Sequence, residues 1–142
     1  MVPDIYLTTR DAPAVPDAPP ARLLRSADAP ALEAVRGAFA AIDPAMGHPF
    51  KVGAAAFADD RIVSIAAITA MTPRYANISV ATLPEWRDRG HATAAAAILT
   101  AGIAATKRIA LWSCSETNGP SLAIARGLGF EEVTQRTFLV RE

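Results

Sequence analysis

Apolar side chains early in the chain are spaced as on one face of a helix. Asp28 is a candidate N-cap residue, Pro30 suits the first turn, and Pro44 ends the pattern. We therefore expect a helix between residues 28 and 43. Its buried face is predicted to carry Leu32, Val35, Phe39 and Ile42.

Short apolar runs bounded by turn residues predict strands along the rest of the chain. These strands are expected at residues 21–25, 51–57, 61–70, 75–83, 109–114 and 131–140. Two further helices are predicted, one over 92–105 that opens near Gly90, and one that starts at Asn118 and stops at Gly127. The order β-α-β-β-β-α-β-α-β indicates an α/β fold. Strands 75–83 and 109–114 should be parallel because a helix connects them.

The N-terminal segment has a different composition. Residues 11–20 contain four prolines and cannot sustain a helix or a sheet, so we interpret them as a linker or an extended surface segment. Before them, residues 5–9 are β-prone and could form a short extra strand. We therefore predict an N-terminal extension over 1–20 and one folded domain over 21–142.

Composition narrows the classes of function. The net charge is zero and no long basic run occurs, so we expect neither a nucleic-acid nor a membrane partner. The single cysteine, Cys114, excludes an internal disulfide and favours a cytoplasmic setting. Residues 1–10 do not resemble a signal peptide, and no apolar run reaches the roughly 20 residues of a membrane helix. No cluster of His, Cys, Asp or Glu has metal-ligand spacing, so no metal is predicted.

The loop from Arg87 to Thr93 is the strongest chemical signal. It joins a predicted strand to a predicted helix and contains two arginines and Gly90. The first backbone N–H groups of a helix have no intrahelical partner and lie at the positive end of its dipole, so they bind anions well. Arg87 and Arg89 would add charge-assisted contacts. This loop is therefore predicted to hold a phosphate group.

The same loop resembles the acyl-CoA-binding motif of the GNAT superfamily of N-acetyltransferases. That motif is Arg or Gln, two residues, Gly, one residue, then Gly or Ala, and here Arg87, Gly90 and Ala92 fill it. The second motif of the family is matched by Asn118, Ser121 and the pair Gly129-Phe130. The likeness extends from residue 21 to about residue 140 and includes the order of the elements.

The resemblance implies a mixed, mostly antiparallel sheet whose central parallel strands splay apart to hold acetyl-CoA or a related acyl-CoA. Pantetheine would pair with the strand backbone, the pyrophosphate would sit on the N–H groups of the loop, and Asn118 would contact the pantetheine arm from the opposite wall. A backbone N–H near Thr82 would stabilise the oxyanion. The predicted cofactor-binding residues are Val80, Ala81, Thr82, Arg87, Asp88, Arg89, Gly90, His91, Ala92, Thr93, Asn118 and Ser121.

The catalytic groups are less well defined. The family often has a tyrosine seven residues after the motif asparagine as the acid that protonates the thiolate, and this chain has Ala125 there. Glu116 is the best candidate for the base, ahead of Glu85. The expected activity is acyl transfer to an amine of a small molecule or peptide. A CoA-binding domain without catalysis is the alternative, and an interaction module without any ligand is the third.

Several residues also have purely structural interpretations. His91 is expected to be a spacer whose backbone N–H matters, Trp112 to pack, and Cys114 to be a core strand residue. His48 is expected to lie in a loop, and Asn118 to cap its helix, which is compatible with cofactor contact.

The last strand raises a question about the edge of the sheet. Many relatives have a further strand after the one predicted at 131–140. We expect residues 5–9 or a partner subunit to cover that edge, so a homodimer is possible. The acceptor pocket is expected near residues 43–50 and 70–75.

Overall fold

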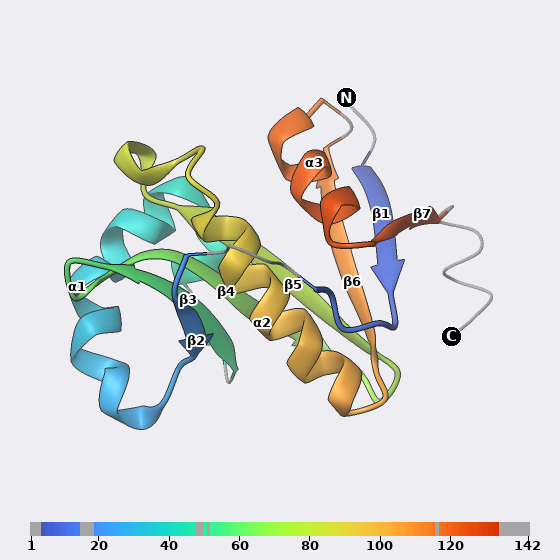
Figure 1. Cartoon of the computed structure of the whole chain (residues 1–142), viewed down its shortest axis with the longest axis horizontal. Helices are drawn as coiled ribbons and strands as arrows, with labels where there is room; N and C mark the ends of the chain where they lie inside the picture. The colour runs from blue at the N-terminus through green and yellow to red at the C-terminus, as the bar shows by residue number, and fades with distance from the viewer. Residues whose placement is uncertain (1–3, 15–18, 48–49, 51, 116, 134–142) are drawn as a thin grey trace.

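The computed structural model describes residues 4–14, 19–47, 50, 52–115 and 117–133. Seven strands form one sheet with helices on both faces (Figure 1). The strands are β1 (Asp4–Thr9), β2 (Ala21–Leu23), β3 (Gly53–Ala58), β4 (Arg61–Met71), β5 (Tyr75–Thr82), β6 (Ile109–Ser115) and β7 (Glu131–Val133). The helices are α1 (Ala29–Ile42), α2 (His91–Ala105) and α3 (Gly119–Gly127), with short 3-10 turns η1 (Ser26–Asp28), η2 (Pro44–Gly47) and η3 (Pro84–Trp86).

The sheet has the order β2-β3-β4-β5-β6-β1-β7, and of its described pairs only β5 and β6 are parallel. This confirms the predicted α/β fold, the order of elements from residue 21 onward, and the parallel pair joined by α2. The final predicted strand, 131–140, is described as far as Val133, and its remainder lies outside the described residues.

The start of α1 differs from the expectation in one respect. Asp28 is the N-cap residue, but its side chain makes no capping hydrogen bond. Instead the Arg22 guanidinium donates to both Asp28 carboxylate oxygens, at 2.6 and 2.8 Å, and the Arg25 N–H donates to Oδ2 at 2.8 Å. The carboxylate therefore fastens the start of α1 to the edge strand β2, because a charged partner competes successfully with a neutral helix N–H.

Two cores lie on opposite faces of the sheet. One packs α2 and α3 against a face that includes Ala54, Ala66 and Ile78. The other packs α1 against the opposite face, which includes Ala55 and Ile65. Neighbouring residues of a strand thus enter different cores, as strand geometry requires. Alanines on β3 and β4 face alanines of α2, and these small side chains let the helix lie close to the sheet.

The parallel pair is only partly paired. The register between β5 and β6 runs from Tyr75 opposite Ile109 to Ile78 opposite Trp112 and then stops. Both strands continue, β5 to Thr82 and β6 to Ser115, so their carboxyl-terminal ends separate (Figure 1). The predicted splaying of the central strands is therefore present.

The N-terminal strand is part of this sheet. β1 runs antiparallel to β6 on one side, from Asp4 opposite Ser115, and to β7 on the other side, with Tyr6 opposite Val133. The predicted short strand at residues 5–9 is thus confirmed, but among the described residues it does not cover the outer edge of the last strand as expected. β1 lies between β6 and β7 and does not cover the outer edge of β7.

Candidate functional site

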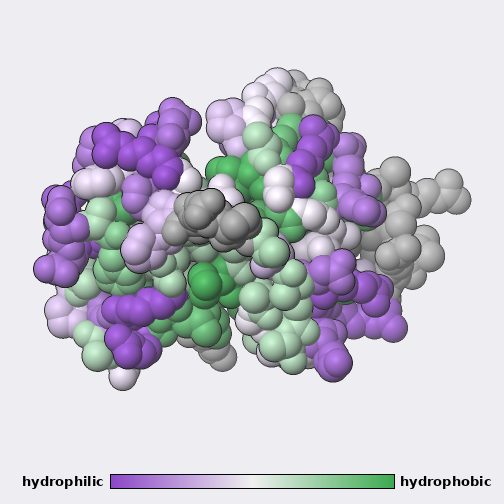
Figure 2. Space-filling model, in the orientation of Figure 1, coloured by the Kyte–Doolittle hydropathy of each residue, from purple (hydrophilic) through white to green (hydrophobic). Residues whose placement is uncertain are grey.

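A cleft of about 600 Å³ opens where β5 and β6 separate. Its walls are the end of β5, the loop from η3 into α2, and the first turns of α3, with Trp112 of β6 also in the lining. Figure 2 shows it as a notch at the upper edge of the molecule, with hydrophobic side chains on its α3 side. The chain segments that form it are distant in sequence. They surround an open space because the parallel strands diverge.

Nearly all residues predicted to contact a cofactor line this cleft. They are Val80, Ala81, Thr82, Arg87, Asp88, Gly90, His91, Ala92, Thr93, Asn118 and Ser121. Arg89 is the exception: its guanidinium lies over the Trp86 ring at 5.0 Å from the centroid and is not part of the lining. The structure therefore brings together residues from both motifs, while their roles toward a ligand stay predictions.

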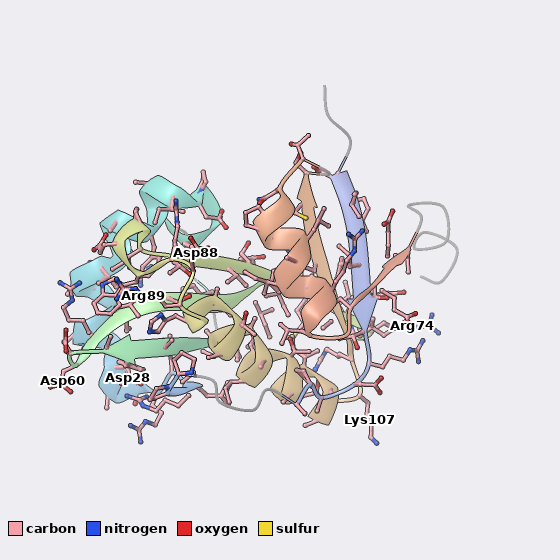
Figure 3. The ribbon with its side chains drawn as sticks, turned by 45° about the horizontal axis from the view of Figure 1, so that its top comes forward. Asp28, Asp60, Arg74, Asp88, Arg89 and Lys107 are labelled. Atoms are coloured by element: carbon pink, nitrogen blue, oxygen red, sulfur yellow. The ribbon has the colours of Figure 1, made fainter. Side chains whose placement is uncertain are left out.

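The loop that precedes α2 has the geometry of an anion site. Gly90 is the N-cap residue and has φ +84°, a left-handed conformation that glycine adopts without steric penalty. The first intrahelical hydrogen bond is donated by the Ala94 N–H to the Gly90 carbonyl at 3.0 Å. The earlier N–H groups of α2 therefore have no helical acceptor and lie at the positive end of the helix dipole. Figure 3 shows Asp88 and Arg89 on this loop, beside the start of α2.

His91 has a larger part in the site than the sequence indicated. Its side chain is buried, it meets the Trp86 ring edge to face at 5.7 Å between centroids, and Nδ1 has no hydrogen-bond partner among the described residues. The sequence indicates only a residue at a helix start. No local signal could show that the imidazole turns inward, because that depends on where Trp86 packs.

The opposite wall is fixed by a short chain of hydrogen bonds. The Ser121 N–H donates to Asn118 Oδ1 at 3.2 Å, which confirms Asn118 as the cap of α3. The Trp112 indole N–H donates to Ser121 Oγ at 2.9 Å. Trp112 is buried and meets Phe130 at 5.5 Å between centroids, so it packs as expected, yet it also lines the cleft.

The β5 wall is held from behind by Ser64 of β4. The Ser64 hydroxyl donates to the Ala81 carbonyl at 3.1 Å and shares a 2.8 Å hydrogen bond with the Thr82 hydroxyl. Since Ser64 has one proton, the Thr82 hydroxyl donates to it when Ser64 donates to Ala81. These buried contacts fix the last two residues of β5 at the edge of the cleft.

Three titratable side chains considered in the sequence lie outside the described residues or outside the cleft lining. Glu116 and His48 lie outside the described residues, and Glu85 is exposed on η3 and is not part of the cleft lining. Burial raises the pKa of the Cys114 thiol, an effect partly opposed by a hydrogen bond with Ser121. The thiol is therefore protonated at neutral pH and is a poor nucleophile.

Metal-ligand clusters and membrane-spanning helices are both absent from the described part of the chain. No group of three or more His, Cys, Asp or Glu side chains is placed to hold a metal ion, and the no-metal expectation stays a prediction. None of its helices combines the length and the apolar character needed to cross a bilayer.

A model of the GNAT acetyltransferase family matches residues 48–139, well over half of the sequence. The chain belongs to the GNAT acetyltransferase family. The match includes both motifs and the splayed strands, so the resemblance noted in the sequence is confirmed. No curated protein matches the sequence.

Solved structures of this family have the same fold. A putative GNAT-family acetyltransferase from Novosphingobium aromaticivorans aligns with 93% of this chain and 60% of its own length, at 23% identity and a TM-score of 0.74. A GCN5-related N-acetyltransferase-like protein from Streptococcus suis aligns with 94% and 59%, at 20% identity and a TM-score of 0.65. This GNAT chain thus spans about three fifths of each.

An aminoglycoside N-acetyltransferase in complex with CoA is more similar in length. The alignment covers 82% of this chain and 94% of that enzyme, at 20% identity and a TM-score of 0.59. These structural alignments establish the shared fold, while identities this low leave the substrate open.

Proposed function

We propose that this GNAT protein transfers an acetyl or other short acyl group from acyl-CoA to an amine of a small molecule or peptide. The observation that carries the proposal is the cleft of about 600 Å³. It joins the loop before α2, the end of β5 whose edge toward β6 is unpaired, and the capped start of α3. A CoA complex of a structural neighbour adds support.

The cleft offers matching groups to the parts of an acyl-CoA. The free N–H groups at the start of α2, together with Arg87, would bind the pyrophosphate. The unpaired edge of β5 at Val80 and Ala81 would hydrogen-bond the pantetheine amides, as an added strand does. Asn118 would contact the pantetheine arm from the opposite wall.

The proposed reaction is a direct transfer. The amine nitrogen attacks the thioester carbonyl carbon, a C–N bond forms, the C–S bond breaks, and the CoA thiolate leaves. A base takes one proton from the amine, with Glu116 as our proposal for it, and the thiolate takes up a proton to become the thiol. A backbone N–H near Thr82 would stabilise the oxyanion of the tetrahedral intermediate.

Calorimetric titration with acetyl-CoA and with CoA tests the cofactor part, and thiol release across a panel of amines tests the transfer. We expect both CoA species to bind and at least one amine to release thiol. Pantetheine alone serves as the control, because it lacks the pyrophosphate and should bind more weakly. If neither CoA species binds, the proposal is wrong.

A second candidate function is CoA binding without catalysis. Its basis is Ala125, which occupies the position of the family's acid and is completely buried, so it offers no hydroxyl to the thiolate. Tight CoA binding with no thiol release from any amine would favour this candidate. Homodimerisation, a cytoplasmic location and the domain boundary at residue 20 stay predictions.

A further inference from the structure

The loop before α2 is not held in place by its own backbone hydrogen bonds. None of the backbone N–H groups from Asp88 to Thr93 donates a hydrogen bond to another described residue. Asp88 at φ +62° and Gly90 at φ +84° are both in the left-handed region, which only glycine adopts without steric cost. The position of these N–H groups relative to the cleft therefore depends on what packs against the loop.

Trp86 supports the loop from the inside of the fold. The Arg89 guanidinium lies over the Trp86 ring at 5.0 Å from its centroid, and the buried His91 imidazole meets the same ring at 5.7 Å between centroids. Trp86 itself packs against the core between α1 and the sheet. These contacts hold the residues on either side of Gly90.

Pro19 supports the loop from the outside. A Cβ built on Gly90 would lie 3.4 Å from Cδ and 3.7 Å from Cγ of Pro19, an ordinary van der Waals distance. The pyrrolidine ring therefore lies directly beside the turn. Gly90 lines the cleft and Pro19 does not, so the ring is on the side of the loop away from the cleft.

The edge of the sheet fixes Pro19 in turn. The next residue, Pro20, accepts a hydrogen bond from the Phe57 N–H of β3 at 3.3 Å, and β2 then begins with Ala21 opposite Ala56. Proline has a fixed φ, and a residue that precedes a proline is restricted to extended conformations. The Pro19 ring therefore has little freedom to move away from the turn, and it connects the edge strand β2 to the loop.

We infer that Pro19 is a positioning residue for the cofactor. It holds the loop where the free N–H groups meet the pyrophosphate, and it couples β2 to CoA binding. This rests on the proposed function, which assigns the loop to the pyrophosphate, and it adds a residue from the N-terminal segment that neither motif contains. Because coupling between two sites is reciprocal, bound CoA must also stabilise the pairing of β2.

Pro19→Gly tests the contact, because it removes the ring and leaves the residues that line the cleft unchanged. We expect the dissociation constant for CoA to rise about fivefold, at the low end of typical coupling between sites. The dissociation constant for pantetheine should stay at the wild-type value, since pantetheine lacks the pyrophosphate. A general loss of stability would weaken both ligands equally, so the ratio of the two constants separates positioning from a purely structural role.

Two further variants serve as controls. Pro19→Val keeps an apolar side chain and an extended backbone before Pro20, so it should retain most of the CoA affinity. Pro13→Gly makes the same exchange elsewhere in the linker, at a residue that does not approach Gly90, and should bind CoA like the wild type.

Amide hydrogen exchange tests the reciprocal effect. The Leu24 N–H, directly after β2, donates to the Gly53 carbonyl at 2.8 Å and therefore reports on the attachment of β2 to β3. Saturating CoA should slow its exchange about fivefold in the wild type, and this slowing should be absent in Pro19→Gly.

Several results would overturn the inference. They are an unchanged CoA affinity in Pro19→Gly, an equal loss of affinity for CoA and pantetheine, an equal loss in Pro13→Gly, or an exchange rate of the Leu24 N–H that CoA does not change. If the wild type binds no CoA, the proposed function is wrong instead, so the two failures are distinguishable.

Discussion

The two walls of the cleft are held in place by different kinds of contact. The β5 wall belongs to a meander in which β3, β4 and β5 follow one another and pair in sequence order. The β6 wall pairs with β5 only as far as Trp112, but with β1 from Ala110 to its last residue, Ser115. One wall is therefore built from neighbours in sequence, and the other depends on the opposite end of the chain.

This difference predicts which substitutions affect each wall of the cleft. The β5 wall leads into the loop that we propose binds the pyrophosphate, and it should form from local contacts. The β6 wall carries Trp112 and leads into α3, and its support by β1 requires closure of a long loop, which is entropically less favourable. Changes in β1 should therefore damage the site from a distance, while changes in the loop should reduce affinity with little effect on the fold.

The largest effect is expected for Leu7→Ala. Leu7 is completely buried in the core under α2 and α3 and lies opposite Trp112. Removing its side chain should lower the free energy of unfolding by about 2–5 kcal/mol, through lost burial and the cavity left behind. Urea unfolding measures this, and CoA affinity should fall as well because the β6 wall loosens.

Leu23→Ala is the control for this variant. Leu23 lies on β2 at the other edge of the sheet and is 43% exposed, so the same chemical change should have a much smaller effect. An equal loss of stability in the two variants would show that β1 has no special role in the β6 wall.

Arg87→Ala tests the β5 wall. If the guanidinium contacts the pyrophosphate, its removal should weaken CoA binding by about 1.5–3 kcal/mol, or roughly 10- to 100-fold, because hydrogen bonds to charged groups are the stronger ones. Calorimetry measures the affinity, and stability should barely change because Arg87 is exposed. Arg61→Ala, at the exposed start of β4, is the charge-matched control and should bind CoA normally.

Gly90→Ala should have an intermediate effect on the same wall. A side chain at φ +84° is strained by about 1–2 kcal/mol, and the new Cβ would lie 3.4 Å from Pro19 Cδ. Gly102→Ala in α2 has open space around its Cβ and should instead stabilise the protein by about 0.5–1 kcal/mol. Thermal unfolding compares the two, and equal effects would contradict the role given to the turn at Gly90.

The smallest expected effect is a pH dependence of the stability at β2, the edge strand that pairs with β3. The hydrogen bond from the Arg22 guanidinium, followed by that from the Arg25 N–H, holds the pKa of Asp28 well below its usual range. A carboxyl whose pKa is lower in the folded than in the unfolded protein stabilises the fold above its unfolded pKa of about 3.9, and this contribution is lost as the pH falls below that value. Wild type should therefore be more stable than Asp28→Asn at pH 7.

The stability difference between these two proteins should shrink by pH 3, which denaturant unfolding at both pH values can measure. Arg22→Gln removes the guanidinium that lowers the pKa of Asp28, so it should flatten the pH dependence. A difference between wild type and Asp28→Asn that is the same at pH 7 and pH 3 would disprove the role given to this ion pair.

The sequence predicted the fold and most of the cleft lining because the signals are local. The spacing from Leu32 to Ile42, the strand at 75–83 and the loop with Gly90 each depend on neighbours a few residues away. Residues from both motifs could be assigned to one site because they resemble the two GNAT motifs, and the connection through α2 makes β5 and β6 parallel. Asp28 is the N-cap residue as predicted, but its carboxylate accepts hydrogen bonds from Arg22 on another element, which the local sequence does not indicate.

Other parts of the site depend on long-range packing and could not be predicted. The His91 imidazole is buried and meets the Trp86 ring, an orientation that depends on how the loop between η3 and α2 packs against the sheet. Ile42 lines the cleft although it ends α1, which packs on the face of the sheet opposite α2. The position of β1 between β6 and β7 is decided by which strand edges are left open, and periodicity does not encode this.

By itself, the sequence determined the order of the elements, the parallel pair and the glycine-containing loop before α2, because hydrogen bonding and side-chain periodicity within short segments fix them. Only the tertiary structure decided that β1 supports the β6 wall and that Ser64 of β4 holds the last two residues of β5. Both are contacts between segments distant in the chain, and their free energy depends on the packing of the whole sheet.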